Sequence, residues 1–171
     1  MVAEVLEWLA PRRGGLFVDG TAGLGGHIRA VLDAGATRVI GFDRDPSALA
    51  LASANLAPVL DRVELVHADY RTAPDELDHR GLTPVDGVLL DLGVSSMQLD
   101  APDRGFSFRR DEPLDMRMDQ SQGDTAADIL RTIDETELAD AIYQFGEERH
   151  SRRVARAIVR ARDEAPIETT G

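Results

Sequence analysis

The chain contains no cysteine and no lysine, and it has no long hydrophobic run. Without cysteine it can form neither disulfide bonds nor thiolate metal sites. No apolar stretch approaches the roughly 20 residues that a membrane-spanning helix needs, and the first residues lack the basic region of a signal peptide. These absences predict a cytoplasmic protein with no membrane segment and no metal site.

The 171 residues are enough for a domain with a substantial core, and 43% of them are hydrophobic. The net charge of -12 argues against a general nucleic-acid binder. The charge is unevenly placed, however, because the stretch 149–162 holds six arginines and no acid. The exclusive use of arginine as the basic residue indicates a composition bias rather than a role.

Apolar runs alternate with helical patterns at a spacing of about 25 residues, which is typical of a doubly wound α/β fold with a parallel sheet. The fourth run is continuously apolar and predicts a strand buried on both faces. A short amphipathic helix is expected at 3–9. The predicted strands are 16–18, 38–42, 63–67 and 85–90, and the predicted helices between them are 28–34, 47–55 and 74–79.

The alternation stops after Asp91. The stretch 92–123 reads as loop, and helices are expected at 126–132, 135–145 and 148–163. Four strands make a thin sheet, so the chain is either a small three-layer unit or an incomplete sheet.

Ten residues between the first strand and helix carry the clearest signal, Val-Asp-Gly-Thr-Ala-Gly-Leu-Gly-Gly-His at 18–27. A dinucleotide fingerprint needs a third glycine where Ile28 stands, and no Gly-Lys-Ser/Thr follows as in a phosphate-binding loop. The acid that opens the turn, Asp19, suits a cofactor with a cationic amino-acid end, such as S-adenosylmethionine. The alternative is a glycine-rich turn with a structural role only.

Each predicted strand is followed by an acid, at Asp19, Asp43, Asp69 and Asp91. The carboxyl ends of parallel strands form the ligand-binding edge of such a sheet, so we expect these acids to line it. Asp43 can accept hydrogen bonds from both ribose hydroxyls of a nucleotide cofactor. Asp45, directly before a proline, is the better candidate for the helix cap.

Two further places can contact a cofactor or an acceptor. Tyr70 follows the third strand and can stack on an adenine, although a lone tyrosine also suits simple packing. After the fourth strand, Asp91, Ser95 and Ser96 offer a carboxylate and two hydroxyls that can hold an exocyclic amine and aim it at a methyl group. The alternative is an ordinary polar loop.

Two segments are candidates for RNA contact. Residues 103–119 interleave arginine with phenylalanine and methionine, a pattern that can stack on unpaired bases or form a lid whose Phe106 and Phe108 pack on the core. Near the C-terminus, five arginines recur at helical spacing, opposite Val154, Ile158 and Ala161. These arginines form either a solvated face or a phosphate contact, and they are Arg149, Arg152, Arg153, Arg156 and Arg160.

The chain resembles the MraW (RsmH) family of bacterial small-subunit ribosomal RNA methyltransferases, which modify N4 of a cytosine. The match covers nearly the whole chain, although Met97 stands where the family usually has proline and family members are considerably longer. The resemblance lies in the runs 18–27, 41–46, 86–100, 104–109 and 113–119, with shorter matches at 146–149 and 166–169.

The resemblance implies a Rossmann-like class I methyltransferase fold, with a cofactor domain at 1–114 and the start of an inserted helical substrate-recognition domain at 115–171. The remaining strands are expected beyond Gly171. It also implies that S-adenosylmethionine is bound by Gly25, Gly26, His27, Asp43, Tyr70, Asp91 and Gln98.

The predicted reaction is methyl transfer from S-adenosylmethionine to N4 of a cytosine in small-subunit ribosomal RNA, free or on an assembling subunit. Asp91, with Ser95 and Ser96 second, is the candidate for orienting the amine. An NAD-dependent oxidoreductase and a non-catalytic RNA- or ribosome-binding module are the rival hypotheses, and the oligomeric state is left open. The predicted RNA contacts are Arg109, Arg149, Arg152, Arg153 and Arg156.

Overall fold

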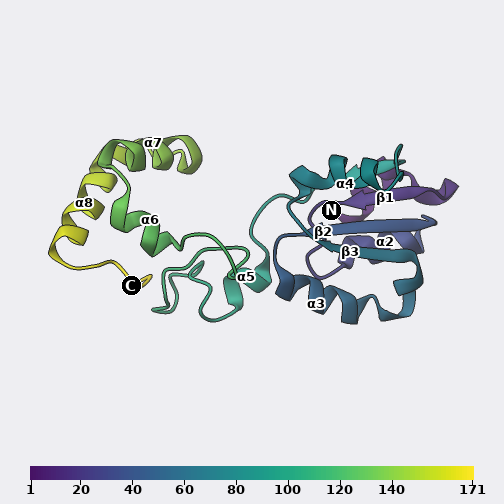
Figure 1. Cartoon of the computed structure of the whole chain (residues 1–171), viewed down its shortest axis with the longest axis horizontal. Helices are drawn as coiled ribbons and strands as arrows, with labels where there is room; N and C mark the ends of the chain where they lie inside the picture. Colours follow the sequence, from purple (N-terminus) through teal and green to yellow (C-terminus); the bar gives the residue numbers. More distant parts are fainter. The chain divides into compact units, whose positions relative to one another are not determined.

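The structure is a computed structural model that describes residues 1–171 except for the side chain of Ser96. The chain divides into two compact units, Met1–Gly93 and Val94–Gly171 (Figure 1). The predicted boundary after residue 114 lies within the second unit, and the extent of an inserted domain stays a prediction. Within the part of the chain that the structure describes, no helix has the length and apolar character to cross a bilayer.

The first unit is built on a parallel four-stranded sheet in the order β3-β2-β1-β4, which confirms the predicted doubly wound α/β fold. Its strands are β1 Leu16–Asp19, β2 Arg38–Asp43, β3 Val63–His67 and β4 Gly87–Leu89. Its helices are α1 Val2–Leu9, α2 Gly26–Asp33, α3 Pro46–Asn55 and α4 Ala73–His79, with 3-10 turns η1 Pro11–Arg13, η2 Ala57–Arg62 and η3 Tyr70–Thr72.

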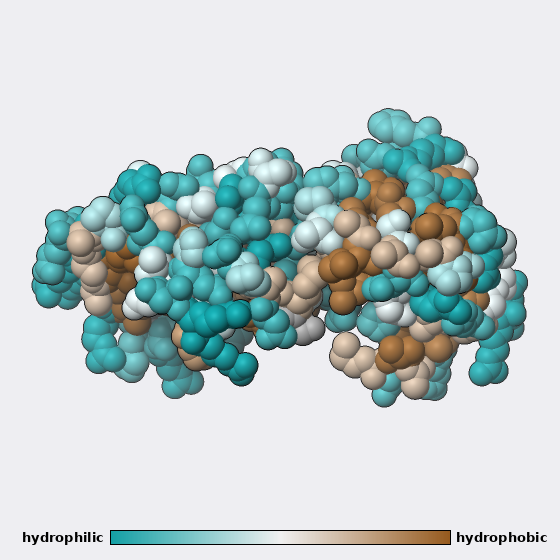
Figure 2. Space-filling model, turned by 90° about the horizontal axis from the view of Figure 1, so that it is seen from below, coloured by the Kyte–Doolittle hydropathy of each residue, from teal (hydrophilic) through white to brown (hydrophobic). Residues whose placement is uncertain are grey.

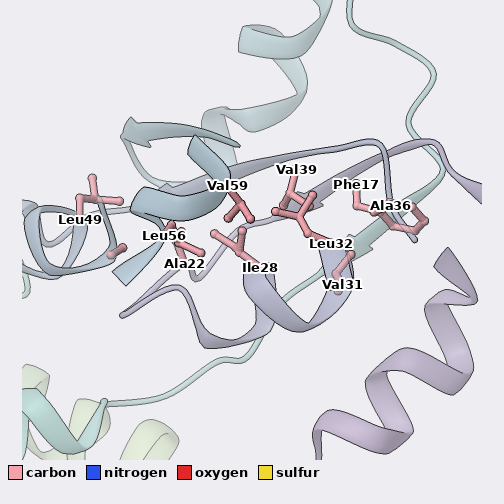
Figure 3. Close-up of a cluster of buried hydrophobic side chains, with 11 residues drawn as sticks. Phe17, Ala22, Ile28, Val31, Leu32, Ala36, Val39, Leu49, Leu56 and Val59 are labelled. Carbon is pink, nitrogen blue, oxygen red and sulfur yellow. The ribbon is translucent and has the colours of Figure 1, made fainter. Parts of the chain in front are cut away.

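Side chains alternate between the two faces of the sheet and build one core on each. Phe17 and Val39 pack with the buried residues of α2 and α3 on one face, where Ile28 and Leu56 are almost fully buried (Figure 3). The next residues along the strands, such as Val18, pack on the other face against α4. Figure 1 shows α4 on the opposite side of the sheet from α3.

The fourth strand does not have both faces buried, so that prediction is wrong. β4 pairs with β1 alone and forms an edge of the described sheet. Val88 is 55% exposed and Leu90 after it is 44% exposed. Hydrophobic surface is visible on this unit in Figure 2. An apolar run predicts a strand, but burial also depends on which elements cover it.

The second unit is helical, with α5 Ser96–Asp100, α6 Ala126–Thr132, α7 Glu135–Gly146 and α8 Ser151–Glu164. The three long helices were predicted, whereas α5 lies in a stretch expected to be loop. Leu138, Ala139 and Ala155 form a small core between α7 and α8. At the C-terminus the Thr170 N–H donates to the Glu112 carbonyl oxygen (2.8 Å), which ties residues 167–171 to residues 110–114.

Buried polar groups organise the segment between α5 and α6. The guanidinium of Arg104, which is buried, donates to the carbonyl oxygens of Arg117 (3.2 Å) and Met118 (2.8 Å). Phe108 is 92% exposed, so the expectation that it packs on the core is wrong. Phe106 is half-buried, and the buried Arg104 links this segment to residues 117–118.

Candidate functional site

The carboxyl ends of β1 and β4 are neighbours at the point where the chain changes its direction across the sheet. From β1 the chain moves outward to β2 and β3, and it then returns to β4 on the other side of β1. Ligands of open α/β sheets bind at such a point. Along this edge the four acids follow one another in the order Asp69, Asp43, Asp19 and Asp91.

The glycine-rich turn after β1 is held by both neighbouring strands. The Gly20 N–H donates to the carbonyl oxygen of Leu89 at the end of β4 (2.9 Å). The Ala22 N–H donates to the carbonyl oxygen of Phe42 in β2 (2.9 Å). These bonds fix the backbone of the turn at the point where the strand order reverses.

Gly25 and Gly26, at the end of this turn, differ in what a side chain at each position would contact. Gly25 has a left-handed φ of 83° and is the N-cap residue directly before α2. A Cβ on Gly25 would lie 2.7 Å from Cδ1 of the buried Leu56, so the core excludes a side chain there. A Cβ on Gly26 would meet nothing within 4 Å. The backbone of Gly26 therefore borders open space that a ligand could occupy.

Asp19 ends β1 with only 3% of its surface exposed. Its Oδ1 accepts hydrogen bonds from the Thr21 N–H (3.0 Å) and hydroxyl (3.3 Å). Its other oxygen, Oδ2, is buried with no hydrogen-bond partner among the described residues. Burial raises the pKa of Asp19 because a carboxylate loses its hydration there. Asp19 is thus a buried acid of the glycine turn with one oxygen to which no described residue donates.

Asp91 is joined to the same turn by residues far away in sequence. Its backbone N–H donates to the Thr21 hydroxyl oxygen (2.8 Å). Its Oδ2 lies 3.9 Å from Nδ1 of His27, whose Nε2 is buried and has no hydrogen-bond partner among the described residues. The structure thus brings together His27 and Asp91, two predicted site residues. The linking role of Thr21 was missed, and the only sequence signal for it is its place two residues after Asp19.

Asp43 braces the turn as well as facing the edge. Its Oδ2 accepts from the Gly23 N–H (2.7 Å) and its Oδ1 from the Asp45 N–H (2.9 Å). Asp45 caps α3 by accepting from the Ser47 N–H (3.0 Å), as predicted. Each Asp43 oxygen keeps one further lone pair for a ligand. The prediction that Asp45 caps the helix is confirmed. Asp43 also has a structural role, because both of its oxygens accept backbone hydrogen bonds.

Tyr70 lies against the glycine turn. A Cβ built on Gly20 would be only 2.9 Å from Cβ of Tyr70. Asp69 before it is occupied by arginines, with Nη2 of Arg71 at 2.7 Å and Nε of Arg44 at 3.5 Å. Hydrogen bonding by Arg71 is the main reason why the pKa of Asp69 falls to about 2. Asp69 is therefore the edge acid whose charge is taken up by ion pairs with neighbouring arginines.

Ser95 and Gln98 belong to the second unit, where they form a capping box at the start of α5. The Ser95 Oγ accepts from the Gln98 N–H (3.2 Å), and the Gln98 Oε1 accepts from the Ser95 N–H (3.0 Å). Both side chains therefore have a structural role in starting α5. The predicted roles of Gln98 in cofactor binding and of Ser95 in holding the amine stay predictions. Ser96, the remaining candidate, lies outside the described side chains.

The arginines expected to contact RNA are exposed on the second unit, with Arg109 in the segment before α6 and the others on or beside α8. Of the apolar residues expected opposite these arginines, Ile158 packs against the small core of α7 and α8, whereas Val154 and Ala161 are exposed. The buried positions of α8 are Ser151 and Ala155. Arg156 has an acidic partner, with its Nε 3.4 Å from Oε1 of Glu135 on the neighbouring α7.

Each unit carries an open hollow of about 500 Å³. In the first unit, α1 and β4 form the hollow with residues that include Trp8, His27, Val88 and Asp91. In the second unit, α7 and the start of α8 form the hollow around Tyr143. The sequence did not predict the second hollow, because its residues come together only when α7 and α8 pack.

A family model described as the MraW methylase family matches residues 1–171. The ribosomal RNA small subunit methyltransferase H of Geotalea uraniireducens is 52% identical over 99% of this chain and 55% of its own length. The protein of the same name from Deinococcus radiodurans is 54% identical over 99% of this chain and 53% of its own length.

A solved structure of an rRNA methylase from Streptococcus thermophilus is 25% identical, with a TM-score of 0.40 over 50% of each chain. The chain spans about half the length of the curated relatives it matches.

Proposed function

The chain belongs to the MraW methylase family, and from that premise we propose that the intact protein transfers a methyl group from S-adenosylmethionine to N4 of a cytosine in small-subunit ribosomal RNA. The relatives are named for ribosomal RNA methylation. The chemistry at the edge of the sheet supports a cationic methyl donor of this kind.

The observation that carries the proposal is the buried acid Asp19, whose Oδ2 has no donor among the described residues, in the turn that also holds Gly26. S-adenosylmethionine has an ammonium group and a sulfonium, and the negative charge of this carboxylate favours a cationic ligand at the turn. The open space at Gly26 lets a ligand approach the backbone, as a cofactor at the start of a helix requires. His27, the next residue, completes this part of the site.

Further residues along the edge fit the other end of the same cofactor. Asp43 keeps free lone pairs for the two ribose hydroxyls, and Tyr70 lies beside the turn, where an adenine ring can contact it. Gln98 is proposed as a further cofactor contact on the family resemblance alone. When bound, the cofactor supplies an electrophilic methyl group on sulfur.

Asp91 is the proposed group for the acceptor. Its side chain is about half exposed and lies near His27, so its carboxylate can accept a hydrogen bond from the cytosine amine. With the donor bound, the amine nitrogen would form a bond to the methyl carbon as the carbon–sulfur bond broke, and S-adenosylhomocysteine would leave. The nitrogen loses a proton to a carboxylate or to water. Ser95 and Ser96 are secondary candidates for holding the amine.

The proposed RNA contacts are Arg109, Arg149, Arg152, Arg153 and Arg156, all of which are exposed. The partner is small-subunit ribosomal RNA or the assembling subunit. Local arginine patches can bind RNA phosphates even though the whole chain carries a net charge of -12.

The test is calorimetry of the intact protein with S-adenosylmethionine and with NAD, for the natural sequence and two alanine variants. We expect Gly26→Ala to weaken the affinity for S-adenosylmethionine at least about tenfold, because its methyl group fills the approach to the backbone. Gly146→Ala is the matched control, since its Cβ also meets nothing within 4 Å but lies at the end of α7. The control should bind like the natural protein.

Asp19→Asn is a second test, because it should raise the stability of the sheet unit and lower its affinity for the cofactor. The amide keeps the acceptor for Thr21 and removes a buried charge, so the sheet unit should become more stable at neutral pH while cofactor affinity falls. Since the pKa of Asp19 is raised by burial, the gain in stability should vanish below the ordinary carboxyl pKa, where Asp19 is protonated in both states.

Three results would overturn the proposal. Binding of NAD in preference to S-adenosylmethionine would favour the oxidoreductase, and RNA binding with no cofactor binding would favour the non-catalytic module. Normal methyl transfer to small-subunit RNA by Asp91→Ala would remove Asp91 from its proposed role.

A further inference from the structure

The hollow between α7 and the start of α8 combines the groups that recognise an unpaired nucleotide. Tyr143 is 60% exposed and Asp140 stands three residues before it on the same face of α7. The other side is strongly basic. The residues that matter here are Asp140, Tyr143, Arg149, His150, Arg152 and Arg153.

The three arginines of the hollow form no ion pair with a described side chain. Arg149, Arg152 and Arg153 are exposed, and no ion pair joins them to any described side chain, in contrast to Arg156, which pairs with Glu135. An arginine in an ion pair must break that pair to bind a phosphate. Arg149, Arg152 and Arg153 have no ion pair to break. Their charges are therefore available to a polyanion.

We infer that this hollow binds an unpaired nucleotide of the RNA, with its base stacked on Tyr143 and its flanking phosphates on Arg149, Arg152 and Arg153. The inference rests on the proposed function for the choice of RNA as the partner. A tyrosine ring stacks on any base, and arginines contact the backbone on either side. The hollow of about 500 Å³ is large enough for one nucleotide.

Asp140 distinguishes this hollow from a plain basic patch. A carboxylate weakens the binding of phosphate, so its presence argues for a ligand that also has hydrogen-bond donors. The exocyclic amines of cytosine, adenine and guanine are such donors, and carboxylates accept from them. The hollow thus offers stacking to the ring, an acceptor to its edge and cations to its backbone.

The experiment measures binding of a short single-stranded RNA that carries 2-aminopurine, in the absence of any methyl donor. Stacking quenches 2-aminopurine fluorescence, so the natural protein should quench it on binding. Tyr143→Ala should weaken affinity by about 5- to 140-fold, the equivalent of about 1–3 kcal/mol for one stacked base, and should abolish the quenching. Tyr143→Phe keeps the ring and should retain both.

Phe145→Ala is the matched control, because Phe145 is another exposed ring of α7, 86% exposed, and does not line the hollow. It should leave affinity and quenching unchanged. Salt dependence separates stacking from charge: Tyr143→Ala should keep the slope of log K against log salt, whereas Arg152→Gln should reduce it by about 0.7 for single-stranded RNA.

Several outcomes would overturn the inference. One is an equal loss of RNA affinity in Tyr143→Ala and Phe145→Ala, and another is an unchanged RNA affinity in Tyr143→Ala. A third is displacement of the RNA by poly-glutamate of equal charge, which would indicate a docking site for an acidic protein. Any of them leaves methyl transfer itself intact. Loss of methyl transfer with normal RNA quenching would contradict the proposed function but not this hollow.

Discussion

The two adjacent glycines of the turn give a sharp test of how the core constrains the site. Gly25→Ala forces a side chain onto a backbone with φ 83° and places its Cβ 2.7 Å from Cδ1 and 2.9 Å from Cγ of the buried Leu56. The left-handed backbone costs about 1–2 kcal/mol, and the overpacking costs about 1–3 kcal/mol. We expect the unfolding free energy of the sheet unit to fall by about 2–5 kcal/mol.

Gly26→Ala is the comparison within the same turn. Its Cβ enters open space and the residue already lies in α2. Alanine costs less backbone entropy than glycine in a helix, so stability should stay the same or rise by up to about 1 kcal/mol. Gly25→Ala should therefore lose stability, and Gly26→Ala should lose only cofactor affinity.

Hydrogen exchange of the amides of β1 and β2 measures the unfolding free energy of the sheet unit directly. Tryptophan fluorescence is unsuitable, because Trp8 is already 87% exposed in the folded state. If Gly25→Ala and Gly26→Ala changed the protection of these strands by the same amount, the reasoning from Leu56 would be refuted. Circular dichroism before exchange checks that both variants are folded.

Three further predictions concern other parts of the chain. Leu138→Ala should lower the unfolding free energy of the helical unit by about 2–4 kcal/mol, seen as faster exchange in α7 and α8, since Leu138 is buried in their small core. The pKa of Asp115 lies at about 2, chiefly because Arg117 donates to it. That interaction stabilises the protein above the ordinary carboxyl pKa and is lost as the pH falls towards 2. Asp115→Asn should therefore cost up to about 2 kcal/mol at pH 7 and almost nothing near pH 2, as followed by thermal unfolding across pH. Asp43→Ala should cost about 1–3 kcal/mol in urea unfolding, because the N–H groups of Gly23 and Asp45 lose their acceptor; an unchanged midpoint would show that water replaces it.

Much of the fold could be predicted because its signals are local. The strand at Val63–His67 and the helix at Ala126–Thr132 have the predicted bounds, and the other predicted strands and helices differ by one to a few residues at their ends. The helix cap at Asp45 was identified from its place before a proline. The short helix α5 was missed, since the capping box of Ser95 and Gln98 lies in a stretch without an apolar period.

The site was only partly predictable, because its decisive contacts join distant residues. Asp19, Asp43 and Asp91 were identified as edge acids, but nothing in the sequence says which oxygens are occupied. The bond from Gly23 to Asp43 spans 20 residues and that from Asp91 to Thr21 spans 70. Likewise, the pairing of Arg156 with Glu135 depends on the packing of α8 against α7.

The sequence by itself determined the alternation of strands and helices, the glycine turn between β1 and α2, and the edge on which the acids lie, because residue spacing and local backbone preference decide these. Only the tertiary structure decided that Asp19 keeps an unpaired buried oxygen, that Asp69 is taken up by Arg71, and that Tyr143 stands over a basic hollow. Burial and pairing depend on which distant segments pack together, and residue spacing alone does not specify them.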